Sequence, residues 1–194
     1  ALNRTEQSLV TAANGTHART NHPAPNDDSL TLSPNHEFLV ARWSRIDHPP
    51  VTELRDARSG ALLLTLETAD ATPPPPKSWP LPETFSAPGR DHSTPIHGII
   101  IRPSHFDPSK KYPVIEEIYA GPHGHFVPKP WSALQRQHRI AEMGAVVVQI
   151  DGMGTNWRSK PFHDVAWRNL NDAGFPDRIE WMKAAAKDRP WMDL

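Results

Sequence analysis

The segment His123-Gly124-His125 is the first candidate for chemistry, because its two imidazoles could bind a metal ion. Imidazole is a common zinc ligand, but a zinc site needs at least a third ligand and usually hydrogen-bonded groups behind the ligands. The chain has no cysteine that could add thiolate ligands. The pattern therefore favours a solvated loop, and we expect no metal and no cofactor.

The segment Asp151-Gly152-Met153-Gly154 follows an apolar run, where a glycine-rich turn could cradle a phosphate group. It lacks both the G-x-G-x-x-G spacing of dinucleotide-binding loops and the lysine of a P-loop. The segment therefore favours a plain turn at the C-terminal edge of a sheet.

Tyr119, which precedes Ala120-Gly121-Pro122, is the third candidate because a fixed phenol can donate a hydrogen bond. A donor aimed at developing negative charge lowers a reaction barrier by about 2.7–4 kcal/mol. A core tyrosine with a satisfied hydroxyl is the alternative. The chain contains no cysteine nucleophile and no G-x-S-x-G motif, which is the nucleophile elbow of α/β-hydrolases.

The composition excludes several classes of partner. The 21 basic and 22 acidic residues nearly cancel, so bulk charge favours neither nucleic acid nor anionic lipid. No apolar run reaches the ~18–20 residues that a membrane helix needs. The segment Ala1–Val10 is polar and lacks the apolar region of a signal peptide. We therefore expect no nucleic-acid partner and no membrane segment in this chain.

Prolines divide the chain into two parts. Eleven of the 22 prolines lie between Pro73 and Pro113, and four are consecutive at Pro73–Pro76. Such a run excludes helix and central strand and predicts an extended connector over residues 71–94, with a long surface loop as the alternative.

Short strands are expected before this connector. The apolar or alternating segments are Leu30–Leu32, Phe38–Trp43, Val51–Asp56 and Ala61–Leu66. Turn-forming residues, among them His48-Pro49-Pro50, separate these segments. Their regular spacing indicates an antiparallel sheet, as in a sandwich or one blade of a β-propeller.

Strands alternate with helices after the connector. The expected strands are Pro95–Arg102, Pro113–Tyr119 and Ala145–Asp151. Helices are expected over Trp131–Met143 and from Pro176 onwards. This alternation predicts the α/β fold class, preceded by an antiparallel β segment.

Motifs spread along the chain carry a resemblance. They are Gly89-Arg90-Asp91, Thr94-Pro95-Ile96-His97-Gly98, Phe106-Asp107-Pro108, Tyr119-Ala120-Gly121-Pro122, Asp151-Gly152-Met153-Gly154 and Asp172-Ala173-Gly174-Phe175. Together they resemble the dipeptidyl peptidase IV-like members of the prolyl oligopeptidase family of serine peptidases. Upstream, Leu32-Ser33-Pro34-Asn35 and Pro49–Ala57 resemble the end of the β-propeller of that family.

The resemblance implies three parts. Residues 1–70 would be the C-terminal part of a β-propeller with its last blade, 71–94 the connector, and 95–194 the N-terminal half of an α/β-hydrolase domain. The triad order in such a domain is Ser, Asp, His, and the elbow is expected shortly after Trp191-Met192-Asp193-Leu194. We therefore expect no triad residue in this chain, which would be inactive by itself. The resemblance gives Tyr119 the role of oxyanion stabilisation.

The resemblance also implies an activity for the full-length parent: release of short peptides, chiefly dipeptides with Pro or Ala in the penultimate position, from peptide N-termini. The alternatives are an esterase or other hydrolase of the same fold, and a non-catalytic interaction module derived from one. A peptide substrate is the expected partner, and the family favours a periplasmic or secreted location.

The expected sheet has an open side. A nucleophile strand would pair with Pro113–Tyr119, so without it one side of this strand has no partner. We also expect apolar side chains of the last helix to be uncovered, namely Ile179, Trp181 and Met182. The chain is therefore expected to associate with itself or with the remainder of the hydrolase domain.

Overall fold

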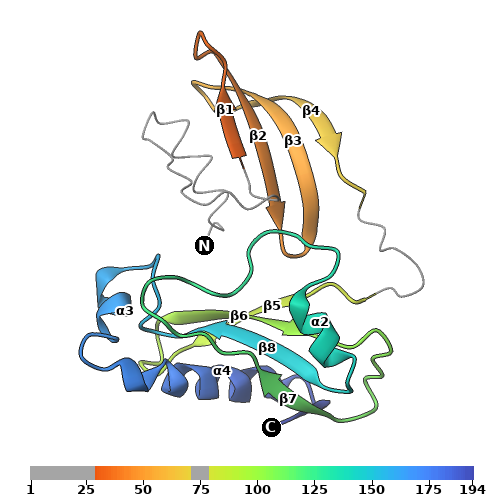
Figure 1. Ribbon diagram of the computed structural model, residues 1–194, viewed down its shortest axis with the longest axis vertical. Coiled ribbons are helices and arrows are strands. Elements are labelled where there is room, and N and C mark those ends of the chain that lie inside the picture. Colours follow the sequence, from red (N-terminus) through yellow and green to blue (C-terminus); the bar gives the residue numbers. More distant parts are fainter. Residues whose placement is uncertain (1–28, 71–78) are drawn as a thin grey trace. The chain divides into compact units, whose positions relative to one another are not determined.

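The computed structural model describes residues 29–70 and 79–194, and it divides into two compact units (Figure 1). The described residues before position 71 and the segment Pro128–Ala133 form the first unit, and the remaining described residues form the second. The proline run Pro73–Pro76 and the polar segment Ala1–Val10 lie outside the described residues.

The first unit is a four-stranded antiparallel sheet in the order β1-β2-β3-β4. Its strands are β1 (Ser29–Leu32), β2 (Phe38–Arg45), β3 (His48–Asp56) and β4 (Leu62–Thr68). The prediction of an antiparallel segment with four strands is confirmed.

The expected turn at His48-Pro49-Pro50 is wrong, because these residues begin β3. Arg45 pairs with His48, which leaves Ile46 and Asp47 as the connection between β2 and β3. Proline is tolerated at the start of a strand, where few ladder hydrogen bonds need its missing N–H group.

The second unit is built on a five-stranded sheet in the order β5-β6-β8-β7-β9. Its strands are β5 (Glu83–Pro88), β6 (Pro95–Ile101), β7 (Tyr112–Glu116), β8 (Val146–Asp151) and β9 (Met192–Asp193). The pairs β5–β6 and β6–β8 are antiparallel, whereas β7 is parallel to both β8 and β9. Every residue of β8 is buried, as its run of three valines predicts.

Helices cover both faces of this sheet, α2 on one face and α4 on the other (Figure 1). The helical segments are α2 (Arg136–Ala141), α3 (Lys160–Asp164), the 3₁₀ turn η1 (Leu170–Asp172) and α4 (Phe175–Lys187). The α/β fold class with a preceding antiparallel β segment is confirmed. Across residues 29–70 and 79–194, no helix has the length and apolar character needed to cross a membrane.

The helix expected over Trp131–Met143 is shorter than predicted, because α2 begins only at Arg136. The preceding residues up to Ala133 belong to the first unit, where the Trp131 N–H donates to Ser44 Oγ over 3.2 Å. This tertiary contact holds Trp131 outside the helix. The expected connector range also contains a strand, because β5 pairs along its length with β6.

Trp181 of α4 is fully buried, so the expectation of an uncovered Trp181 is wrong. Its ring packs edge-on against Phe85 of β5, and its Nε1–H donates to the Phe85 carbonyl over 3.2 Å. Gly98 of β6 leaves room for the indole, since a Cβ there would lie 2.7 Å from Trp181 Cζ2. Ile179, two residues earlier on the helix, is exposed as expected.

The open side of β7 is partly covered. Tyr112 and Pro113 pair with Met192 and Asp193 of β9, so the expectation of an unpaired strand is wrong at its start. Beyond this two-residue ladder, the structure as described places no strand beside Val114–Glu116 on that side.

Candidate functional site

The candidate site consists of the loops that follow β7 and β8 at the carboxyl edge of the sheet. Ligands in open α/β sheets bind outside this edge, where neighbouring connections diverge to opposite faces. Here the chain leaves β7 toward α2 and leaves β8 toward α4, which lie on opposite faces (Figure 1). The loops contain Tyr119, His123, His125 and the Asp151–Gly154 turn.

Tyr119 lies past the end of β7, and its side chain is 55% exposed. Within the described residues Tyr119 is therefore not part of the core. Its ring packs at 4.5 Å between centroids on Phe126 and edge-on at 5.6 Å on His123. The ring is therefore supported on two sides while part of it faces solvent.

Gly121 is required for this packing. A Cβ at position 121 would lie 2.6 Å from His123 Cε1 and 3.0 Å from Tyr119 Cε1. His123 therefore serves to support Tyr119. Within residues 29–70 and 79–194, no group of three or more metal-ligating side chains gathers around it or elsewhere.

Asp151, the last residue of β8, fixes the loop that contains these aromatic side chains. Its buried carboxylate accepts the Phe126 N–H over 2.7 Å and the Val127 N–H at 3.2 Å. A second link joins the two loops, because the Asn156 N–H donates to the Gly124 carbonyl over 2.8 Å. The loops after β7 and β8 thus form one hydrogen-bonded assembly.

Two backbone donors of the Asp151–Gly154 turn are used inside the protein. The Met153 N–H donates to Asp177 over 2.9 Å, and the Gly154 N–H donates to the Phe162 carbonyl over 2.8 Å. A phosphate cradle needs such N–H groups to point at the ligand. The geometry therefore supports the plain turn that the sequence favoured.

Arg90 connects the turn between β5 and β6 to η1 and to the start of α4, a role that the sequence did not reveal. Its guanidinium binds both Asp172 and the fully buried Asp177. The Asp177 carboxylate also accepts a hydrogen bond from the Met153 N–H. The hydrogen bonds from Arg90 hold the pKa of the Asp172 carboxyl below its ordinary value, and the same bonds to Asp172 and Asp177 raise the pKa of Arg90. The only signal in the sequence was that Arg90 and Asp172 lie in two of the motifs that carry the resemblance.

A buried ion pair lies at the end of β7. Arg178 of α4, whose side chain is 1% exposed, donates from Nη1 to Glu116 over 2.5 Å and from Nε to the Ala173 carbonyl over 2.9 Å. The pair ties α4 to the strand that precedes Tyr119. Nothing in the local sequence pattern pairs residues this far apart.

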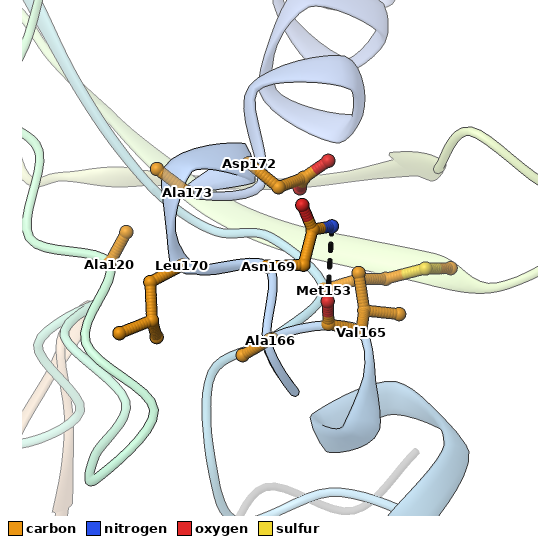
Figure 2. A pocket seen from close by; sticks show the side chains of 9 residues that line it. Ala120, Met153, Val165, Ala166, Asn169, Leu170, Asp172 and Ala173 are labelled. Carbon is orange, nitrogen blue, oxygen red and sulfur yellow. Dashed lines mark hydrogen bonds between the residues drawn. The ribbon is translucent and has the colours of Figure 1, made fainter.

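A small cavity adjoins the site, and Figure 2 shows the side chains around it. Ala120 and Met153 contribute from the two loops, and Asn169 donates to the Val165 carbonyl over 3.3 Å at its wall. Its volume of about 10 Å³ has room for one water molecule and not for a peptide side chain. As lined by the described residues, the cavity is too small for a substrate side chain.

Comparisons with known proteins agree on one family. Residues 131–194 match the family model of the prolyl oligopeptidase family. A protein named probable dipeptidyl-aminopeptidase B from Arthroderma benhamiae is 33% identical over 119 residues, which is 58% of this chain and 13% of that relative. The protein of the same name from Uncinocarpus reesii is 36% identical over 92 residues, 47% of this chain and 10% of the relative.

Two solved structures have a similar fold. A crystal structure from Bacteroides ovatus, assigned as a dipeptidyl aminopeptidase IV, aligns with a TM-score of 0.73 at 31% identity and covers 86% of this chain. Dipeptidyl peptidase 4 of Porphyromonas gingivalis aligns with a TM-score of 0.65 at 24% identity over the same share. The chain spans 24% of each solved chain and 13% or less of these curated relatives.

Proposed function

Because the chain belongs to the prolyl oligopeptidase family, among its dipeptidyl peptidase IV-like members, we propose that it is part of a serine peptidase that removes dipeptides from peptide N-termini. Substrates with Pro or Ala in the penultimate position are the expected class. The names of the curated relatives support the release of dipeptides.

In this proposal the first unit is the end of a β-propeller and the second is the N-terminal part of an α/β-hydrolase domain. The four-stranded antiparallel sheet supports the first assignment, since such sheets are the blades of propellers. The mixed sheet with helices on both faces supports the second. Because β5 pairs with β6, we place the start of the hydrolase part at Glu83 or earlier.

The observation that carries the proposal is the fixed, half-exposed Tyr119 at the carboxyl edge of the sheet. When a nucleophile attacks the substrate carbonyl, the carbon–oxygen double bond becomes a single bond and its oxygen gains negative charge. The Tyr119 hydroxyl would donate a hydrogen bond to this oxygen while keeping its proton. Such a donor is worth about 2.7–4 kcal/mol in the transition state.

The nucleophile, the Asp and the His of the triad are assigned to residues outside this sequence, because it contains no G-x-S-x-G motif. The 194 residues alone should therefore neither hydrolyse Xaa-Pro or Xaa-Ala chromogenic substrates nor react with a fluorophosphonate probe. Stoichiometric labelling of a serine in this chain would contradict the assignment.

The direct test uses the full-length gene product. We expect hydrolysis of Xaa-Pro and Xaa-Ala p-nitroanilides with a free N-terminus, and loss of hydrolysis when that N-terminus is acetylated. Cleavage of the acetylated substrates would refute release of dipeptides from free N-termini. Cleavage of simple esters without any peptide hydrolysis would favour the esterase, and no hydrolysis of either would favour a non-catalytic module.

A further inference from the structure

His163 of α3 contacts the loop that contains Tyr119 and takes no part in the reaction proposed above. Its Nε2 atom lies 2.8 Å from the carbonyl oxygen of Pro122, three residues after Tyr119. A carbonyl oxygen only accepts hydrogen bonds, so Nε2 must bear the proton and donate it. The contact joins residues 41 positions apart in the chain.

The helix that presents His163 is short but well anchored. Ser159 caps its N-terminus, and the ring of Phe162 is buried in the core of the second unit. The backbone carbonyl of Phe162 also accepts a hydrogen bond from the Gly154 N–H, which links the helix to the turn after β8. Arg158, next to the cap, places its guanidinium 4.4 Å over the Phe162 ring and donates to the Pro95 carbonyl.

The other hydrogen bonds that tie this loop to the turn after β8 lie farther along the chain from Tyr119. They reach the loop at Gly124, Phe126 and Val127. Of these hydrogen-bonded positions in the loop, Pro122 is the one nearest to Tyr119 in the sequence, and its partner His163 belongs to α3. A proline at this position limits the backbone further, because its φ angle is fixed.

The geometry points to His163 as a positioning residue for the Tyr119 hydroxyl. By holding the Pro122 carbonyl, His163 sets the path of the backbone between Tyr119 and the His123–Phe126 segment that supports its ring. His163 acts through Pro122 and does not need to touch the substrate. This inference rests on the proposed function, because it concerns the orientation of the proposed oxyanion donor.

A double-mutant cycle in the full-length gene product tests the inference. We expect His163→Ala to lower kcat for an Xaa-Pro p-nitroanilide about 10- to 100-fold while KM changes less than about twofold, since small displacements of a transition-state donor reduce kcat. In a Tyr119→Phe background the same change should lower kcat by less than about twofold, because coupled residues are not additive. Equal losses in the two backgrounds would overturn the inference.

Two amide substitutions separate the hydrogen bond from the shape of the side chain. The amide nitrogen of Gln reaches about as far as Nε2, whereas that of Asn reaches only as far as Nδ1. His163→Gln should therefore retain most of kcat and His163→Asn should not. Identical kcat values for the two variants, each with unchanged thermal unfolding, would refute the hydrogen-bond role.

Asp164→Ala is the matched control on the same helix. It removes the exposed ion pair with Lys160 and touches neither Pro122 nor the core, so kcat and KM should stay unchanged. The Tyr119→Phe variant alone distinguishes the two failures. If its kcat equals that of the wild type, the oxyanion proposal fails and the inference falls with it; if its kcat falls and the cycle is additive, only the inference fails.

Discussion

Arg90, in the turn between β5 and β6, forms three hydrogen bonds with Asp177, in the first turn of α4. The Arg90 backbone N–H and Nε donate to Oδ1 over 2.9 and 3.1 Å, and Nη2 donates to Oδ2 over 2.9 Å. Asp177 is fully buried and holds the Met153 N–H with the same carboxylate. The turn after β8 therefore depends on a charge that Arg90 neutralises.

Removal of Arg90 should destabilise the protein strongly. Arg90→Met leaves the buried Asp177 carboxylate without its cation, and loss of one partner of a buried pair costs about 3–5 kcal/mol. The apparent unfolding temperature of the full-length protein measures this loss. Arg139→Met, at an exposed position of α2, is the matched control and should change it little.

The Arg90–Asp172 contact should make the folding stability depend on pH in the acidic range. The hydrogen bonds from Arg90 lower the pKa of the Asp172 carboxyl below its ordinary 3.8, so the unfolded chain binds this proton more readily than the folded protein. The stabilisation is thus fully present well above pH 3.8 and is lost as the pH falls through the lowered folded pKa. Asp172→Asn should make the acid unfolding curve shallower, and an unchanged curve would contradict the prediction.

Tyr119→Phe should lower kcat of the full-length enzyme about 10²-fold with little change in KM, because the hydroxyl acts only in the transition state. Tyr112→Phe is the matched control, since this chain has two tyrosines and the buried Tyr112 hydroxyl accepts the Asp107 N–H over 2.8 Å. Loss of the Tyr112 hydroxyl should lower stability and leave kcat unchanged. The opposite pattern would assign Tyr119 a structural role.

Gly121→Ala should lower kcat with little loss of stability. The new methyl group would contact the ends of the His123 and Tyr119 side chains, which can move at the surface but then no longer fix the phenol. Gly124→Ala in the same loop meets only ordinary contacts of 3.4 Å with Phe126 and should leave kcat unchanged. Steady-state kinetics of the two variants, compared with their unfolding temperatures, test this expectation.

The isolated 194-residue chain should associate with itself at micromolar concentration. Strand β4 lies at the edge of its sheet in the described residues and exposes leucines along its length, namely Leu62, Leu63, Leu64 and Leu66. Exposed apolar edge strands pair with other chains, and a lysine on the edge opposes this pairing. Sedimentation should show oligomers that Leu64→Lys weakens, and a monodisperse wild-type monomer would contradict the prediction.

The sequence predicted those elements whose pattern alone determines them. The three valines of β8 and the apolar positions of α4 indicate their structures without any knowledge of neighbours. Strand β5 was missed because Pro82 precedes it, Pro88 ends it, and its stability comes from pairing with β6. The start of α2 was missed because the contact between Trp131 and Ser44 overrides the helical pattern.

The candidate site was predictable only in its residue types. The sequence indicated that Tyr119 lies at the end of a strand, and the structure has it past the end of β7. Its role as a donor came from the resemblance and stays a prediction. The contacts that hold it were not predictable, because His163 and Asp151 reach the loop from other elements. Long-range side-chain contacts of this kind leave no periodic pattern in a sequence.

The network around Arg90 also sets an order of events during synthesis. All residues of the β5–β6 hairpin and of its turn, where Asp91 accepts the Ser93 and Thr94 N–H groups, are present once Ile101 has left the ribosome. Asp172 and Asp177 lie 82 and 87 residues after Arg90, so Arg90 cannot form these ion pairs until most of the second unit has been synthesised. Closure of this ion-pair network is therefore a late folding step, and a nascent chain stopped before residue 172 cannot lock the turn after β8.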